Sequence, residues 1–511
     1  MLASLSLPSL LTLFFIMLIA SGLSGLLFLH PRVPLSFVRI HICISALPPL
    51  VSLVALANSS VNGNAGPWSL DSSLAWLMAF FVLAIGLIIQ RFSVRYLMGD
   101  GHYRKYFTLF TFTTSVASIA WLSDDLRLMV IFWGATLFGL TSLIRLNLAW
   151  KVTSEAAKVS GRLFMLSWFS LLFAIIWLFQ ASGQWQLSLV LTNDSLAQLG
   201  SWEITGINLL IILAVIIPAA QWPFQRWLIE SVVAPTPVSA IMHAGLVNAG
   251  GIMLTRFSPL FNGDIASIML LILASISVLI GSGISLVQVD YKRQLVGSTI
   301  GQMGFMLIQC ALGAYIAAII HLILHGLFKA TLFLQAGSAV SRFEVSTRVN
   351  ERSSYLWIMA GRTLALVVGV AFWLMAPGEG YQLISALILG WSLSVSWTQL
   401  VAFGEGRIGR IAGLSFLGGA AIVYFIIHNL FYEWLYTTVF QSAQPPISVV
   451  IIVVCLLLFG SALGTWVARN RSSVSFAVLY LWLVRLGEAK PKAVESHPNY
   501  LKQYLSRGGH Q

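Results

Sequence analysis

Apolar runs of about twenty residues, repeated along the whole chain, constrain this sequence more than any other feature. A helix rises about 1.5 Å per residue, so a run of this length matches the hydrocarbon core of a bilayer, roughly 30 Å thick. Of the 511 residues, 58% are hydrophobic and only 9% are charged. Soluble proteins carry about 25% charged residues, so the sequence excludes a soluble enzyme and predicts an all-α polytopic membrane protein.

Turn and charge signals divide the apolar runs into about fifteen predicted transmembrane helices. We expect them near residues 8–29, 35–57, 73–92, 106–123, 125–147, 161–182, 206–223, 236–256, 265–289, 292–312, 313–340, 357–376, 381–403, 411–432 and 447–468. The first run lacks a preceding basic segment and a small-residue cleavage motif, which favours a retained helix over a signal peptide. In the tail, the short apolar stretch 476–486 predicts an interfacial helix.

Basic residues are confined to one side of this predicted arrangement. Among the 29 Lys and Arg, all except Arg127, Arg256 and Lys329 fall in loops and helix ends that follow odd-numbered helices, or in the tail. Because Lys and Arg gather on the cytoplasmic side, we expect the amino terminus outside and the carboxyl terminus in the cytoplasm of a bacterial inner membrane. The same bias explains the net charge of +12 without nucleic-acid binding.

Three titratable residues share one face of the predicted helix 313–340. His321, His325 and Lys329 follow at i, i+4 and i+8 within the segment HLILHGLFKA, so they project along roughly 12 Å of the helix axis. A charged or titratable group inside a membrane is costly and usually functional. A lone His would more often be a packing residue, but three such groups on one face favour an ion pathway.

A second candidate region runs from the predicted helix 206–223 into the next helix. Pro218, Pro223, Pro235 and Pro237 each remove a backbone donor and predict a broken helix. Broken helices at membrane depth line cavities or are buried in protein. His243 follows this break, and the sequence leaves open whether it is a relay or a hydrogen-bonded core residue.

The remaining polar residues predict less. Asp124 and Asp125 are suited to the positive end of a helix, and His41 and His428 are predicted to be packing residues. The three cysteines are also predicted to pack and to bind no metal: Cys43, Cys310 and Cys455. We find no zinc-ligand spacing, Walker loop, dinucleotide fingerprint or nucleophile elbow, so we expect neither a cofactor nor a metal in this chain.

Three segments resemble the antiporter-like membrane subunits of respiratory complex I, Mrp sodium/proton antiporters and membrane hydrogenases. They read QWPFQRWLIESVVAPTPVSAIMHAG, DYKRQLVGSTIGQMGFM and HLILHGLFKATLFLQAGS. The resemblance implies two inverted five-helix repeats with broken helices around a hydrated ion path. The implied domains are N-terminal helices in 1–105, a first repeat in 106–256, a second in 265–403, C-terminal helices in 411–468 and a cytoplasmic tail in 469–511.

Two departures from the superfamily pattern narrow the resemblance. Trp133 is followed by Gly134 where those pumps carry Trp-Glu, and Pro218 stands near the position of their Lys. Without this Glu–Lys couple, the chain most resembles the DabB family, the membrane subunits of DabA–DabB inorganic carbon transporters. That resemblance implies a DabA-like, zinc-containing partner on the cytoplasmic side, to which the carbonic-anhydrase-like chemistry would belong.

The resulting functional hypothesis is a transport subunit rather than an enzyme. It would conduct a cation, with H⁺ preferred over Na⁺, through His243, His321, His325 and Lys329, and would couple that flow to uptake of CO₂ or bicarbonate. Arg226 and Glu230 are auxiliary candidates that could replace the missing couple. The alternatives are a proton-pumping or Na⁺/H⁺ antiporter subunit, and a structural anchor that only docks its partner.

Overall fold

The structure is a computed structural model in which every regular element is a helix. It describes residues 6–58, 67–69, 72–147, 150–261, 265–338, 355–374, 386, 390, 406–436, 438–439, 447–470 and 472–489. Within these ranges, extended pairing is limited to two isolated bridges, between Trp68 and Ser123 and between Asp125 and Gln186. The predicted all-α fold class is confirmed.

The helices follow one another closely along the chain. The long ones are α1 (Leu7–Leu29), α3 (Leu47–Asn58), α4 (Ser73–Tyr96), α5 (Tyr103–Leu122), α6 (Leu126–Arg145), α7 (Lys151–Ser182), α10 (Ser201–Ile216), α14 (Ile265–Val287), α15 (Tyr291–Ala311), α16 (Tyr315–Ser338), α17 (Tyr355–Leu374), α19 (Gly406–Leu435), α20 (Ile447–Arg469) and α21 (Val474–Leu486). Shorter pieces are α2 (Val38–Ser45), α8 (Leu187–Val190), α9 (Asn193–Ala197), α11 (Arg226–Glu230), α12 (Thr236–Ile241) and α13 (Ala249–Arg256).

By length and composition, eight helices in the described residues are long and apolar enough to cross a membrane. Most predicted helices coincide with observed ones, but the predicted start of helix 161–182 is wrong, because α7 begins at Lys151. Its extra turns carry Lys151, Glu155 and Lys158, which lengthen the helix beyond its apolar part. The predicted helix 381–403, which would complete the second repeat, lies outside the described residues.

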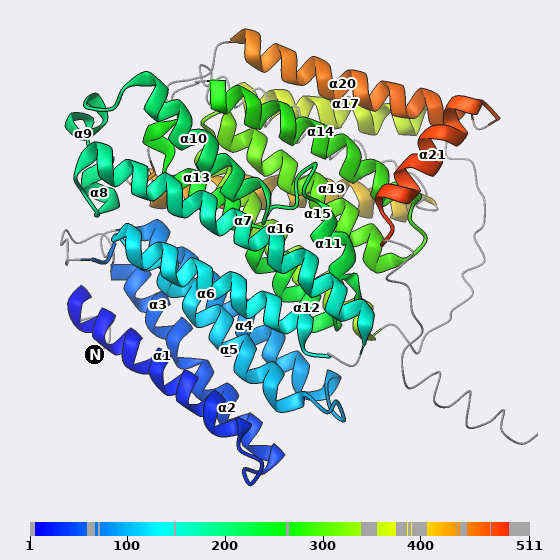
Figure 1. Ribbon diagram of the computed structural model, residues 1–511. Coiled ribbons are helices and arrows are strands. Elements are labelled where there is room, and N and C mark those ends of the chain that lie inside the picture. Colours follow the sequence, from blue (N-terminus) through cyan, green and yellow to red (C-terminus); the bar gives the residue numbers. More distant parts are fainter. Residues whose placement is uncertain are drawn as a thin grey trace, which may run out of the picture.

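Figure 1 shows α1 to α6 on one flank of the molecule and α17 and α20 on the other, with α14, α15 and α16 between them. Close packing of α14 and α15 depends on glycines. A Cβ on Gly297 would lie 2.6 Å from the backbone nitrogen of Ser285, and one on Gly304 would lie 2.8 Å from the Ala274 carbonyl oxygen. Only glycine permits this approach, which brings α15 against α14.

Polar contacts of Asp124, Asp125 and Arg256 stabilise the helix ends on the side predicted to face outward. Asp125 caps α6 and pairs with Arg127, an interaction that lowers the pKa of its carboxyl. Asp124 accepts hydrogen bonds from the backbone and hydroxyl of Ser188. Arg256 donates to the carbonyls of Ala120 and Ser123 and so joins α13 to the end of α5.

The predicted packing role of the cysteines is correct only for Cys310, which is buried. Cys43 and Cys455 are exposed on the helix surface. An apolar run does not reveal which face of its helix turns inward, and Cys43 and Cys455 both lie on an outward face. All three are free thiols.

Candidate functional site

The break after α10 is the first element of the candidate site. The helix ends at Ile216, and the chain turns through residues 217–225 before α11 begins, which agrees with the interruption predicted at Pro218. Ending a helix inside the membrane leaves carbonyl groups without partners. The Trp227 indole donates to the Ile217 carbonyl oxygen at 2.7 Å, so the break is stabilised by its own downstream segment.

His243 lies on a π-helical turn that the sequence pattern did not predict. Between α12 and α13, residues Met242–Leu246 form this turn, and the Val247 nitrogen bonds to the Met242 carbonyl oxygen. Such turns insert an extra residue and often mark functional positions. The His243 ring is buried and stacks on Phe333 of α16, with ring centroids 4.3 Å apart.

The predicted stripe on α16 is present and points into the protein. His325 and Lys329 are 6% and 1% exposed, and the rings of His321 and His325 are 6.0 Å apart. His321 Nδ1 donates to the side-chain oxygen of Gln309 at 3.2 Å. Among the described residues, His325 Nε2 has no hydrogen-bonding partner, so a buried imidazole nitrogen is left to bind a solvent molecule or an ion.

Thr299 on α15 connects the α16 stripe to His243. Lys329 Nζ donates to the Leu295 carbonyl oxygen at 3.0 Å, and the Thr299 hydroxyl donates to the same oxygen at 2.9 Å. His243 Nδ1 lies 3.0 Å from that hydroxyl. Because a hydroxyl carries one proton, His243 Nδ1 donates whenever Thr299 bonds to Leu295. Lys329 and His243 are thus linked through Leu295 and Thr299, and His325 and His321 continue this line along the same face of α16.

Sequence reasoning missed several uncharged polar residues around this line. Gln221 and Asn248 each leave a buried side-chain oxygen unpaired within the described part of the chain, as does the Ser239 hydroxyl one turn before His243. Asn248 also lies against Gly326 of α16, next to His325. The signal was available, because amides and hydroxyls inside apolar runs are rare and costly unless paired.

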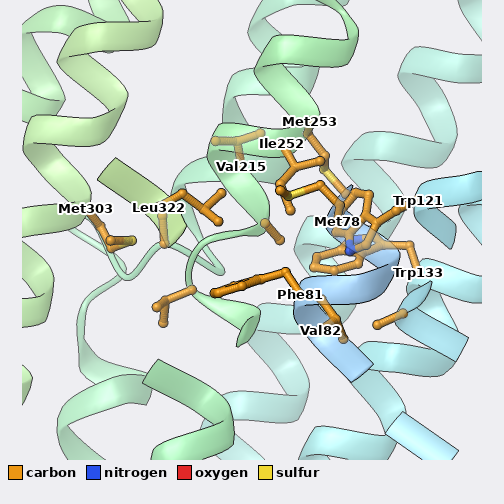
Figure 2. Close-up of a cluster of buried hydrophobic side chains, with 14 of the residues drawn as sticks. Met78, Phe81, Val82, Trp121, Trp133, Val215, Ile252, Met253, Met303 and Leu322 are labelled. Carbon is orange, nitrogen blue, oxygen red and sulfur yellow. The ribbon is translucent and has the colours of Figure 1, made fainter. Parts of the chain in front are cut away.

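The site of the missing acid is filled by a tryptophan. A Cβ on Gly134 would lie 2.5 Å from Trp168 Nε1, and this nitrogen donates to the Val130 carbonyl oxygen at 3.0 Å. Figure 2 shows that Trp133 meets Trp121 and Met78 in an apolar cluster, with Met253 of α13 beside them. The space beside position 134 is thus taken by the Trp168 indole, and the neighbouring Trp133 is packed in an apolar cluster.

The remaining candidates are placed apart from this line. Arg226 Nε donates to Glu230 at 2.6 Å within α11, so the two auxiliary candidates pair with each other. His41 is buried and bonded through both ring nitrogens, to Ser24 and to Gln90 and Thr111. His428 meets the edge of Phe372. Across the described ranges, no three His, Cys, Asp or Glu side chains are grouped to hold a metal ion.

Comparison with known proteins places this geometry in a family. Residues 123–409 match the family described as NADH:quinone oxidoreductase/Mrp antiporter, transmembrane. The "Probable inorganic carbon transporter subunit DabB" of Bacillus subtilis (strain 168) is 84% identical, over 99% of this chain and all of the relative. DabB1 of Halothiobacillus neapolitanus is 32% identical, over 63% of this chain and 62% of the relative.

A solved structure has the same fold. The Mrp complex from Dietzia sp. aligns with 99% of this chain and 59% of the matched chain, with a TM-score of 0.65 and 21% identity. This match shows the fold, while the family match and the DabB relatives indicate a membrane transport subunit rather than an enzyme. On these grounds the chain belongs to the DabB family of inorganic carbon transporter subunits, within the NADH:quinone oxidoreductase and Mrp antiporter membrane superfamily.

Proposed function

We propose that this chain is the cation-conducting, energy-coupling membrane subunit of an inorganic carbon uptake complex in the bacterial inner membrane. The observation that carries the proposal is the buried line from His321 to His243, in which Lys329 and Thr299 share the Leu295 carbonyl. Imidazoles and a desolvated amine can pass protons through water that lies between them. In this proposal the conducted ion is H⁺ rather than Na⁺.

The proposed partner is a DabA-like, zinc-containing subunit on the cytoplasmic side. The B. subtilis relative is named as a subunit, and zinc-dependent hydration of CO₂ would belong to the partner. In this arrangement the amino terminus faces outward and the carboxyl terminus is cytoplasmic, as the positions of Lys and Arg predict. Flow of protons through the present chain would make the partner's reaction directional.

Conduction down the gradient, rather than pumping, fits the packing around Gly134. A pump needs a titratable group whose charge is cycled against another, and the indole of Trp168 occupies the space where a side chain at position 134 would lie. Arg226 and Glu230 do not replace the couple in this proposal, since each is engaged by the other. The path is then formed by His243, His321, His325 and Lys329.

The proposal is tested by growth in ambient air of a carbonic-anhydrase-deficient bacterium that expresses this chain with its DabA-like partner. We expect rescue by the native pair, and loss of rescue with an uncoupler or with Lys329→Ala. The matched control is Lys158→Ala, because Lys158 is exposed and pairs with Glu155 at the surface. Assembly of each variant with the partner is checked by co-purification.

The outcomes separate the alternatives. Rescue that survives Lys329→Ala in an assembled complex would contradict the ion path and favour a structural anchor. No rescue by an assembled native pair would contradict carbon uptake and favour a pump or antiporter subunit. Rescue that requires Na⁺ at constant pH would show that the conducted ion is Na⁺ and not H⁺.

A further inference from the structure

An open pocket of about 410 Å³ lies where three segments of the chain meet. The segments are the turn that follows α4, the approach to α12 and the first turn of α15. The lining residues used below are Tyr96, Met98, Asp100, Ala234 and Lys292. Arg95 and Arg104, in and after α4, flank this turn, so the positive-inside bias places the pocket on the cytoplasmic side.

The pocket lies one helical turn from the buried line. Lys292, Leu295 and Thr299 are spaced by three and four residues on α15 and therefore share one face. Lys292 lines the pocket, Leu295 accepts from Lys329, and Thr299 contacts His243. From Lys292 to Thr299 the helix rises only about 10 Å.

Polar contacts hold the pocket in shape. The Tyr96 hydroxyl bonds to the Thr236 hydroxyl at 2.8 Å, which ties α4 to the first residue of α12. Lys292 Nζ donates to the Ala234 carbonyl oxygen at 3.1 Å and so fixes the segment that precedes α12. Both contacts therefore hold the segment that leads into α12, the short helix that carries Ser239 and precedes His243.

We propose that this pocket is the cytoplasmic opening of the ion path and that Lys292 is a positioning residue for it. The inference rests on the proposed function. A proton that leaves the Lys329 ammonium group passes to a water molecule, which becomes H₃O⁺ and releases the proton through the pocket, and Lys329 becomes neutral. The charged side chains of the lining are one carboxylate, Asp100, and one ammonium group, Lys292, which is already bonded to a carbonyl, so the lining favours water and cations over an anionic ligand.

The test places a single cysteine in the pocket. Cys43 and Cys455 are replaced by Ser and Cys310 by Ala, and Met98→Cys is introduced because Met98 is 62% exposed and lines the pocket. The matched control is Val289→Cys, which is 92% exposed between α14 and α15 and is not among the residues lining the pocket. Inverted membrane vesicles that contain the complex are treated with a membrane-impermeant, cationic methanethiosulfonate, and proton flux is measured after an imposed pH jump.

We expect labelling at position 98 to reduce the flux to that of Lys329→Ala vesicles, whereas equal labelling at position 289 leaves it unchanged. Complete labelling at position 98 with full flux would overturn the proposal that the pocket is the opening, but would not contradict the ion path. Unlabelled vesicles with no more flux than Lys329→Ala would overturn the proposed function and the opening together. As a second measurement, Lys292→Ala should reduce flux in an assembled complex, and Lys292→Arg should retain it because Arg can still donate to Ala234.

Discussion

The Thr299 hydroxyl joins two buried groups, so Thr299→Val removes a connection while nearly preserving shape. The variant loses the bond to Leu295 and leaves His243 Nδ1 without its partner. An average hydrogen bond contributes about 0.5–1.5 kcal/mol, and orphaning a buried polar group costs about 1–3 kcal/mol. The matched control is Thr331→Val on α16, since Thr331 is exposed and its hydroxyl bonds to the Leu327 carbonyl within the same helix.

The difference between these variants isolates the His243 contact. We expect Thr299→Val to lower the free energy of unfolding by about 1–3 kcal/mol more than Thr331→Val does. The measurement is the thermal midpoint of the purified complex, which should be lower for Thr299→Val than for Thr331→Val. We also expect it to slow carbon-dependent growth, with Thr299→Ser restoring both because it keeps the hydroxyl. Equal midpoints for the two Val variants, together with native growth of Thr299→Val, would refute the connection through Thr299.

Three further predictions concern packing and the outer face. Gly281→Ala should lower the thermal midpoint, because its Cβ would meet the Gly301 backbone and overpacking costs about 1–3 kcal/mol; Gly22→Ala, with nothing within 4 Å, should leave the midpoint unchanged or raise it. Gly134→Ala should also lower the midpoint, and combining it with Trp168→Leu should cost less than the sum of the two single variants. The pKa of Asp125 is lowered from 3.8 by Arg127, so its stabilisation is present at neutral pH and disappears as the pH falls through that lowered value; the midpoint difference between native protein and Asp125→Asn should shrink below about pH 4.

The sequence predicted the helices well because a bilayer imposes a long apolar run on each of them. It also predicted the α16 stripe, since residues at i and i+4 share a face whatever the surroundings. It could not predict the π-helical turn at His243, which depends on packing against Phe333 and on the i to i+5 bond of Val247. The role of Thr299 was not predicted for a related reason, because its contact with His243 joins two segments that are far apart in the sequence.

The packing around Trp133 and Gly134 explains why α6 has no counterpart to the α16 stripe. Trp168 lies against Gly134 and bonds to the Val130 carbonyl, so an acid at position 134 would have to displace an indole that is already hydrogen-bonded. It would then stand in apolar surroundings without a cationic partner, where a carboxylate is strongly disfavoured. The absence of an acid at position 134 therefore agrees with the packing of the neighbouring residues and does not depend on one substitution alone. Under the proposed function, and among the described residues, protons follow the titratable line that the π-helical turn at His243 builds together with α15 and α16.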